Sequence, residues 1–175
     1  MSIALEIFHK KNIEKTSEYI IVANIANELK SYLDSEIIQS QISEAHKFEA
    51  KSSDIQAIFS DKANQLGFVS EKKGLFKNYQ TAALRPDYYK LLSEKTGIII
   101  EVERGKTVLN NMDLLDIWKC HICENANYLF LIVPHMRHSG DGSTSSTYPK
   151  VVKRMQSFFI EENYINVDAI FIFGY

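Results

Sequence analysis

Three apolar runs in the second half of the chain constrain the fold more than any other feature. They are GIIIEVE at 97–103, NYLFLIVP at 127–134 and VDAIFIFGY at 167–175. The first has few polar breaks, and the other two are continuous enough to predict strands buried on both faces. Helical patterns at 108–123 and 150–163 lie between the runs. This alternation predicts an α/β fold with a mixed central sheet flanked by helices.

The first half of the chain is predicted to be helical and then to form a strand meander. The expected elements are helices over 13–34 and 52–67, a weaker helix with a loop over 35–52, and strands over 68–76 and 79–92. We therefore expect a helical N-terminal part over 1–52. Turns of the meander are expected at Lys73-Gly74 and near Pro86.

Length and composition fit a single domain over 1–175. The chain has 175 residues, 45% of them hydrophobic, and a net charge of -2. That charge gives no argument for nucleic-acid binding, although a locally basic surface would be compatible with it. No apolar stretch approaches the roughly 20 residues of a membrane span, and no signal-peptide pattern opens the chain. With only Cys120 and Cys123, the composition indicates a cytoplasmic protein with reduced thiols.

Two carboxylates interrupt the first apolar run. Glu101 and Glu103 are two residues apart, and side chains of a strand alternate between faces, so both acids are expected on the same face. Burial of an unpaired carboxylate costs several kcal/mol even after relaxation. A basic partner, a shared proton or a divalent metal ion would offset that cost.

A third acid, Asp87, is expected beside them. A hairpin from Asp87 through the turn at 93–97 would bring it alongside Glu101. Three carboxylates in one place make a hard-oxygen site suited to Mg²⁺, which activates water and stabilises a phosphodiester transition state. Taken alone, Asp87 is also explained by a solvent-facing position at a strand start, and the two glutamates by a strand that emerges into solvent.

These residues resemble a known motif. Asp87 followed by Glu101-Val102-Glu103 is similar to the PD-(D/E)xK nuclease motif in its E-x-E variant, as in the BamHI- and BglII-like restriction endonucleases. The likeness continues through 99–134, where a strand, a helix and an apolar strand ending in Pro follow one another. It covers about 54–134 and rests on a short polar signature together with the order of the elements.

The resemblance implies a restriction endonuclease-like fold and a DNA endonuclease that depends on Mg²⁺, with Mn²⁺ as an alternative metal. Asp87 and Glu101 would be metal ligands, with the Val102 carbonyl as another, and Glu103 would be a base or would orient water. The family also has an acid on the helix before the meander, for which Asp61 and Glu71 are rival candidates. A type II restriction enzyme or phage-defence nuclease acting on double-stranded DNA as a homodimer is the implied function.

Two alternatives stay open at this point. The chain could be a nuclease-fold protein that binds DNA or serves as a structural subunit, with its acids on the surface. It could also be a nuclease that acts on RNA. An intact acid triad in a pocket favours the enzyme, whereas salt-bridged and splayed acids favour the binding protein.

Several further motifs have an ordinary structural explanation beside a functional one. Arg104 and Lys106 are candidates for phosphate contacts or simple surface charges. The CHIC sequence predicts core packing rather than a metal or redox site, because two cysteines do not complete a structural zinc site. The helix over 108–123 is expected to bury one apolar face, formed by Val108, Met112, Leu115, Trp118 and Ile122.

The C-terminal third contains the remaining basic and polar candidates. The polar stretch over 135–148 predicts a loop that either contacts DNA or is simply flexible. The basic residues Lys150, Lys153 and Arg154 share part of the next helix and would contact a nucleic-acid backbone or only solvent.

Overall fold

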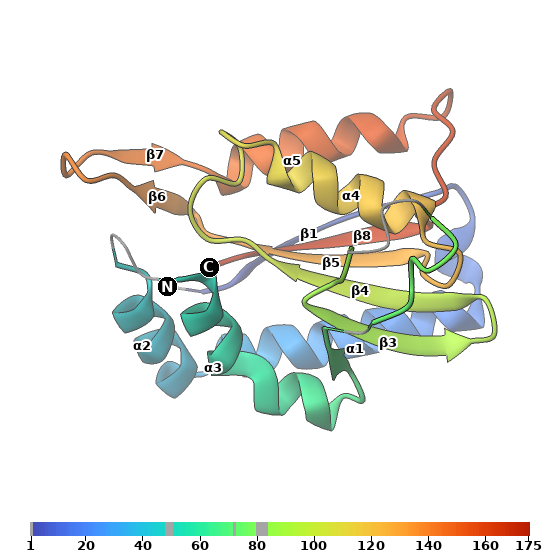
Figure 1. Ribbon diagram of the computed structural model, residues 1–175, viewed down its shortest axis with the longest axis horizontal. Coiled ribbons are helices and arrows are strands. Elements are labelled where there is room, and N and C mark those ends of the chain that lie inside the picture. The colour runs from blue at the N-terminus through green and yellow to red at the C-terminus, as the bar shows by residue number, and fades with distance from the viewer. Residues whose placement is uncertain (1, 48–50, 72, 80–83) are drawn as a thin grey trace.

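The computed structural model describes residues 2–47, 51–71, 73–79 and 84–175 (Figure 1). The helices are η1 (Ile13–Lys15), α1 (Ser17–Leu33), α2 (Glu36–Ala45), α3 (Ser52–Gln65), α4 (Met112–Ile122), α5 (Tyr148–Gln156) and η2 (Ser157–Phe159). The strands are β1 (Ala4–His9), β2 (Val69–Ser70), β3 (Tyr88–Ser93), β4 (Thr96–Val102), β5 (Tyr128–Val133), β6 (Met136–His138), β7 (Thr144–Ser146) and β8 (Ala169–Gly174). None of the helices in these ranges has the length and hydrophobicity needed to cross a membrane.

A six-stranded mixed sheet forms the centre of the molecule. Its strand order is β1-β8-β5-β4-β3-β2. The strands β4, β5 and β8 are parallel, whereas β1, β3 and β2 pair with their neighbours in antiparallel fashion. All six residues of β5 and of β8 are buried, as expected for central strands covered on both faces. The predicted α/β fold with a mixed sheet is confirmed.

Helices cover both faces of the sheet, and β4 alternates between them. The helices α1, α2 and α3 pack on one face, and α4 and α5 pack on the other (Figure 1). Ile98, Ile100 and Val102 belong to the core beneath α1–α3, while Ile99 belongs to the core beneath α4 and α5. The period of two therefore places Glu101 on the face covered by α4 and α5.

The N-terminal part is not entirely helical, so that expectation is wrong for its first residues. Strand β1 pairs with β8 over six residue pairs, from Ala4 opposite Gly174 to His9 opposite Ala169. The hydrogen-bonding partner is remote in sequence, and for that reason the local pattern of the first residues does not reveal the strand. After β1 in the sequence, helices α1 and α2 follow the predicted order.

Two predicted strands and one predicted loop also differ from the structure. The strand expected over 68–76 is reduced to the two residues of β2, and that expected over 79–92 begins only at Tyr88, with 80–83 outside the described residues. The polar stretch over 135–148 is not an irregular loop. It contains the β6–β7 hairpin, which extends away from the main sheet (Figure 1).

Helix α4 turns a different face inward than its apolar pattern predicted. Leu115 is 47% exposed and Trp118 is 42% exposed, so these two members of the expected face are wrong. The buried residues of α4 are Asp113, Asp116, Ile117 and Cys120. Two buried acids on a helix require polar partners, and basic residues of α4 and α5 supply them, Lys119 for Asp116 and Arg154 for Asp113.

Candidate active site

The hairpin of β3 and β4 brings Asp87 to Glu101. Tyr88 pairs with Ile100, so the same register extended by one residue sets Asp87 opposite Glu101. The Oδ2 atom of Asp87 accepts a hydrogen bond of 2.8 Å from the backbone N–H of Val102. The expected hairpin is therefore present, and the Glu101 carboxylate lies on the side of the sheet that α4 covers, whereas Asp87 at the edge of the hairpin also interacts with Gln56 of α3.

Helix α4 adds two residues that the sequence interpretation missed. The Nζ atom of Lys119 lies 2.7 Å from Oε1 of Glu101 and 3.4 Å from Oδ1 of Asp116. Glu101 and Asp116 are 4% and 1% exposed, so this contact is made away from water. The i,i+3 spacing of Asp116 and Lys119 on a helix is the sequence signal that places them on one side of α4.

The acids are crowded enough to disfavour their charged forms. Burial, with Asp116 and Asp87 nearby, raises the pKa of Glu103 to about 8. Burial and Asp116 also raise the pKa of Glu101 well above its ordinary value, and burial raises the pKa of Asp87. Because Asp116 and Asp87 raise the pKa of both Glu101 and Glu103, we refer to these four residues as the carboxylate cluster.

Lys119 is the cation within this cluster. Burial raises the pKa of Asp116 to about 7 even though Lys119 opposes the shift. For Lys119 itself, burial lowers the pKa, but Glu101 and Asp116 outweigh that effect and raise it above its ordinary value. One ammonium group therefore faces several acids, and the cluster carries an excess of negative charge whenever those acids are ionised.

The residues proposed to complete the acidic site lie elsewhere or at its margin. Asp61 is exposed on α3, a helix that packs on the opposite face of the sheet. Glu71 is exposed, pairs with Arg85 at 3.5 Å and affects the pKa of Asp87 only as a minor cause. Asp116, which the sequence interpretation did not consider, is the acid that the fold adds to the cluster.

The chain after β4 ties the cluster to neighbouring elements. The hydroxyl of Tyr175 donates a hydrogen bond of 2.9 Å to the backbone carbonyl of Glu103. The guanidinium of Arg104 donates to the backbone carbonyl of Lys47. Lys106 is exposed, so its alternatives, a phosphate contact or a simple surface charge, both stay open.

The donor chemistry of the cluster fits a hard divalent cation. Carboxylate oxygens are the ligands that Mg²⁺ prefers, and Oδ2 of Asp116 is buried without a hydrogen-bond partner in the described structure. As the side chains stand, no three acidic, histidine or cysteine side chains of the described ranges are arranged as metal ligands. Lys119 instead bonds to two of the acids.

The two cysteines are structural. Cys120 and Cys123 are both buried and form no disulfide, and burial raises the pKa of each thiol. A raised thiol pKa leaves little thiolate to bind metal or react. The predicted core-packing role of the CHIC sequence agrees with these observations.

The basic residues of α5 are partly committed to the fold. The Nε atom of Arg154 lies 3.3 Å from Oδ2 of Asp113, which is fully buried, and its Nη2 atom donates to Asn111 at 2.7 Å. Arg154 therefore anchors α5 to α4. Lys150 and Lys153 keep their two alternatives, a backbone contact or a solvated surface.

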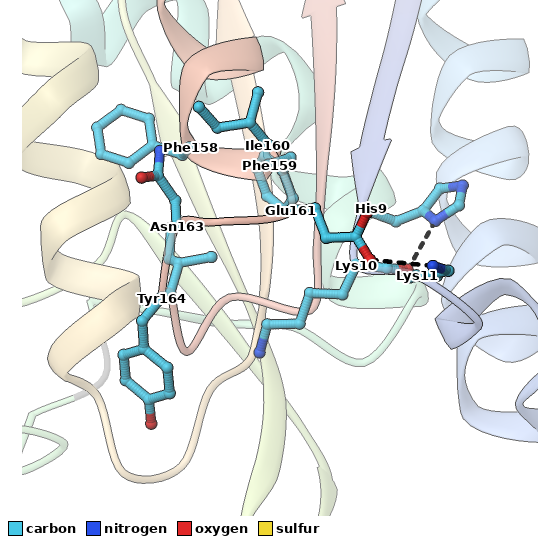
Figure 2. Close-up of a pocket in the computed structure, with 10 residues that line it drawn as sticks. His9, Lys10, Lys11, Phe158, Phe159, Ile160, Glu161, Asn163 and Tyr164 are labelled. Atoms are coloured by element: carbon cyan, nitrogen blue, oxygen red, sulfur yellow. Dashed lines mark hydrogen bonds and ion pairs between the residues drawn. The ribbon is translucent and has the colours of Figure 1, made fainter.

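A cavity of about 470 Å³ opens at the other end of the sheet (Figure 2). It is lined by the end of β1 and by residues 158–165, and His9 there pairs with Ala169 at the amino end of β8. Its lysines are already paired, Lys10 with Asp168 at 2.9 Å and Lys11 with Glu161 at 3.0 Å. The carboxylate cluster lies at the opposite, carboxyl end of the parallel strands, where ligands bind in open α/β sheets.

The mixed sheet with helices on both faces agrees with a restriction endonuclease-like fold, which a comparison with solved structures supports. Among solved structures, the restriction endonuclease BglII in complex with a DNA 16-mer is similar to this chain, with a TM-score of 0.51 and 13% sequence identity. The similarity covers 99% of this chain and 78% of the BglII chain. No protein-family model matches the sequence, and no curated protein is significantly similar to it.

Proposed function

We propose that this protein is a metal-dependent endonuclease that hydrolyses phosphodiester bonds of double-stranded DNA. The observation that carries the proposal is the cluster of four carboxylates at the carboxyl end of β4, within a restriction endonuclease-like fold. The similarity to an enzyme solved with DNA supports DNA as the substrate. Crowded, partly buried acids of this kind are typical of functional sites.

In this proposal each residue has a defined role. Asp87, Glu101 and the Val102 carbonyl would hold Mg²⁺ or Mn²⁺, which supplies charge stabilisation and lowers the pKa of bound water. Glu103 would orient the attacking water and accept its proton. The hydrogen bond from the Val102 N–H to Asp87 fixes that carboxylate against the end of β4.

The assembly and biological setting follow from the same proposal. An enzyme with one site per chain that cuts both strands works best as a dimer with twofold symmetry, so we propose a homodimer. Sedimentation of the free protein and of its DNA complex tests this, and a strict monomer in both would contradict it. A cytoplasmic restriction enzyme or phage-defence nuclease is the corresponding role.

A second function is favoured by one specific observation. Lys119 is bonded to Glu101 and Asp116, and such salt-bridged acids also fit a nuclease-fold protein that binds DNA without cutting it. Under that alternative the cluster would be structural. Removal of an acid would then leave DNA binding intact, and there would be no cleavage to lose.

The decisive experiment is cleavage of supercoiled plasmid DNA with Mg²⁺, with Mn²⁺ and with EDTA. The proposal expects linear or nicked product with either metal and none with EDTA. An RNA of matched sequence, tested in parallel, separates a DNA nuclease from an RNA nuclease. Asp61→Asn is the matched control, because this exposed acid lies on the opposite face of the sheet and its loss should not change the rate.

Two outcomes would redirect the assignment. If the protein binds DNA but cleaves it with neither Mg²⁺ nor Mn²⁺, the result would favour the DNA-binding protein. Cleavage of RNA but not of DNA would keep the chemistry and change the substrate.

A further inference from the structure

Lys119 connects a helix to the strand that carries the candidate site. Its ammonium group contacts Glu101 of β4 at 2.7 Å and Asp116 of α4 at 3.4 Å. The side chain of Lys119 is only 13% exposed. A single cation therefore holds together two buried acids that come from different elements.

The pair is poorly explained as a device for stability alone. Replacement of a buried ion pair by well-packed apolar residues is often neutral or stabilising, because desolvation of the charges offsets their attraction. On its other face, β4 packs with apolar side chains alone, those of Ile98, Ile100 and Val102. The retention of a charged group on this face calls for a further role.

The bonding of Lys119 also leaves an acceptor open. It uses one oxygen of each acid, and Oδ2 of Asp116 stays buried without a partner in the described structure. Asp116 is fixed by α4, so its free oxygen has a defined position beside Glu101.

We infer that Lys119 is a positioning residue that holds the carboxylates of Glu101 and Asp116 in a fixed orientation for a divalent cation. The inference rests on the proposed function, because it assigns Lys119 to the same site. It adds α4 to that site and makes Asp116 a contributor of a further oxygen. Partners that orient metal ligands affect metal affinity and activity without touching the metal themselves.

The direct test measures Ca²⁺ binding by calorimetry for wild type, Lys119→Met and Lys119→Arg, without DNA. Measurement at pH 9, above the raised pKa values of about 8 for Glu103 and about 7 for Asp116, keeps those two acids ionised. We expect Lys119→Met to weaken binding by about tenfold, and Lys119→Arg to restore part of the loss. Because removal of a positive charge alone would strengthen cation binding, weaker binding reports the lost orientation.

A matched control and a kinetic readout complete the test. Lys30→Met removes a lysine from another part-buried ion pair, with Asp34, on the far face of the sheet and should leave Ca²⁺ binding unchanged. In the cleavage assay Lys119→Met should lower kcat by about 100-fold with little change in KM for DNA. Circular dichroism verifies that each variant is folded. If Lys119→Met does not fold, Lys119→Arg takes its place in both measurements.

The outcomes separate this inference from the proposed function. Ca²⁺ binding by Lys119→Met that equals or exceeds that of wild type overturns the positioning role, whether or not the protein cleaves DNA. Wild-type protein that binds Ca²⁺ through this cluster but never cleaves DNA overturns the proposed function alone. Wild-type kcat in folded Lys119→Met also overturns the positioning role.

Discussion

The two faces of the central sheet solve the same packing problem in different ways. Beneath α1–α3, strand β4 presents Ile98, Ile100 and Val102 to an apolar core. Beneath α4, the same strand presents Ile99 and then Glu101, which meets Asp116 and Lys119. The first face gains free energy from apolar burial, whereas the second buries charges at a cost. Both faces belong to one strand. Substitutions on the apolar face can therefore serve as controls for substitutions at the candidate site on the charged face.

The largest expected effect comes from removal of the central acid. Glu101→Ala should lower the cleavage rate by more than about 100-fold, or ~3 kcal/mol of transition-state stabilisation, because a metal ligand is lost. The fold should survive, since one crowded carboxylate is relieved. Plasmid cleavage at saturating Mg²⁺ measures the rate, and circular dichroism verifies the fold. A wild-type rate in this variant would make the catalytic assignment wrong.

A neighbouring substitution on the other face should lower stability and leave cleavage unchanged, the reverse of what we expect for Glu101→Ala. Ile100→Ala removes a fully buried side chain one residue away and should lower the free energy of unfolding by about 2–5 kcal/mol. The folded fraction should cleave DNA as wild type does, because Ile100 faces α1–α3. Urea unfolding gives the stability, and activity per folded molecule gives the comparison. A specific loss of activity here would erase the contrast between the faces.

Glu103→Lys sharpens the comparison within the charged face itself. We expect cleavage to fall by about 10- to 100-fold, because the change alters both metal affinity and the orientation of water. DNA binding should be kept or become tighter, since an acid that repels phosphates is replaced by a base. Parallel measurement of Kd and kcat distinguishes these effects. Weaker DNA binding would contradict the expectation that Glu103 repels the phosphates of bound DNA.

The smallest effect is a pH dependence of stability to which Glu103 of the charged face should contribute. Glu103 has a pKa of about 8 in the folded protein against an ordinary value of 4.5, so the folded state binds more protons between those values. Its contribution to stability is therefore complete below about pH 4 and is lost as pH rises toward 8. With EDTA present, Tm should fall between pH 6 and pH 8.5, and Glu103→Gln should flatten that slope. An unchanged slope in Glu103→Gln would assign the effect to other groups.

Much of the charged face was predictable from β4 alone. The alternation of Glu101, Val102 and Glu103 fixes which acids share a face, and the short connection to Asp87 favours a hairpin. These are local signals, because period and turn length depend on nearby residues only. The predicted grouping of the carboxylates could therefore be stated without knowledge of the rest of the fold.

The contribution of α4 could not be predicted from its apolar pattern. Leu115 and Trp118 look like members of a buried face, yet the structure exposes them and buries Asp116. The side that a helix turns inward depends on what lies beneath it, and here Lys119 of α4 meets Glu101 of β4, a contact that the packing of the helix on the sheet decides and the local pattern does not. Strand β1 escaped prediction for the same reason, because its partner β8 is more than a hundred residues away.

The position of β8 has a consequence for how the protein is made. This strand lies between β1 and β5, yet it is synthesised long after both of them. On the ribosome, β1 must wait for more than a hundred further residues before it finds its partner, and β5 keeps one edge open until then. Folding that depends on such distant pairing is slow. We expect ribosome-arrested chains that end before β8 to remain sensitive to protease, because β1 and β5 cannot join one sheet without that strand.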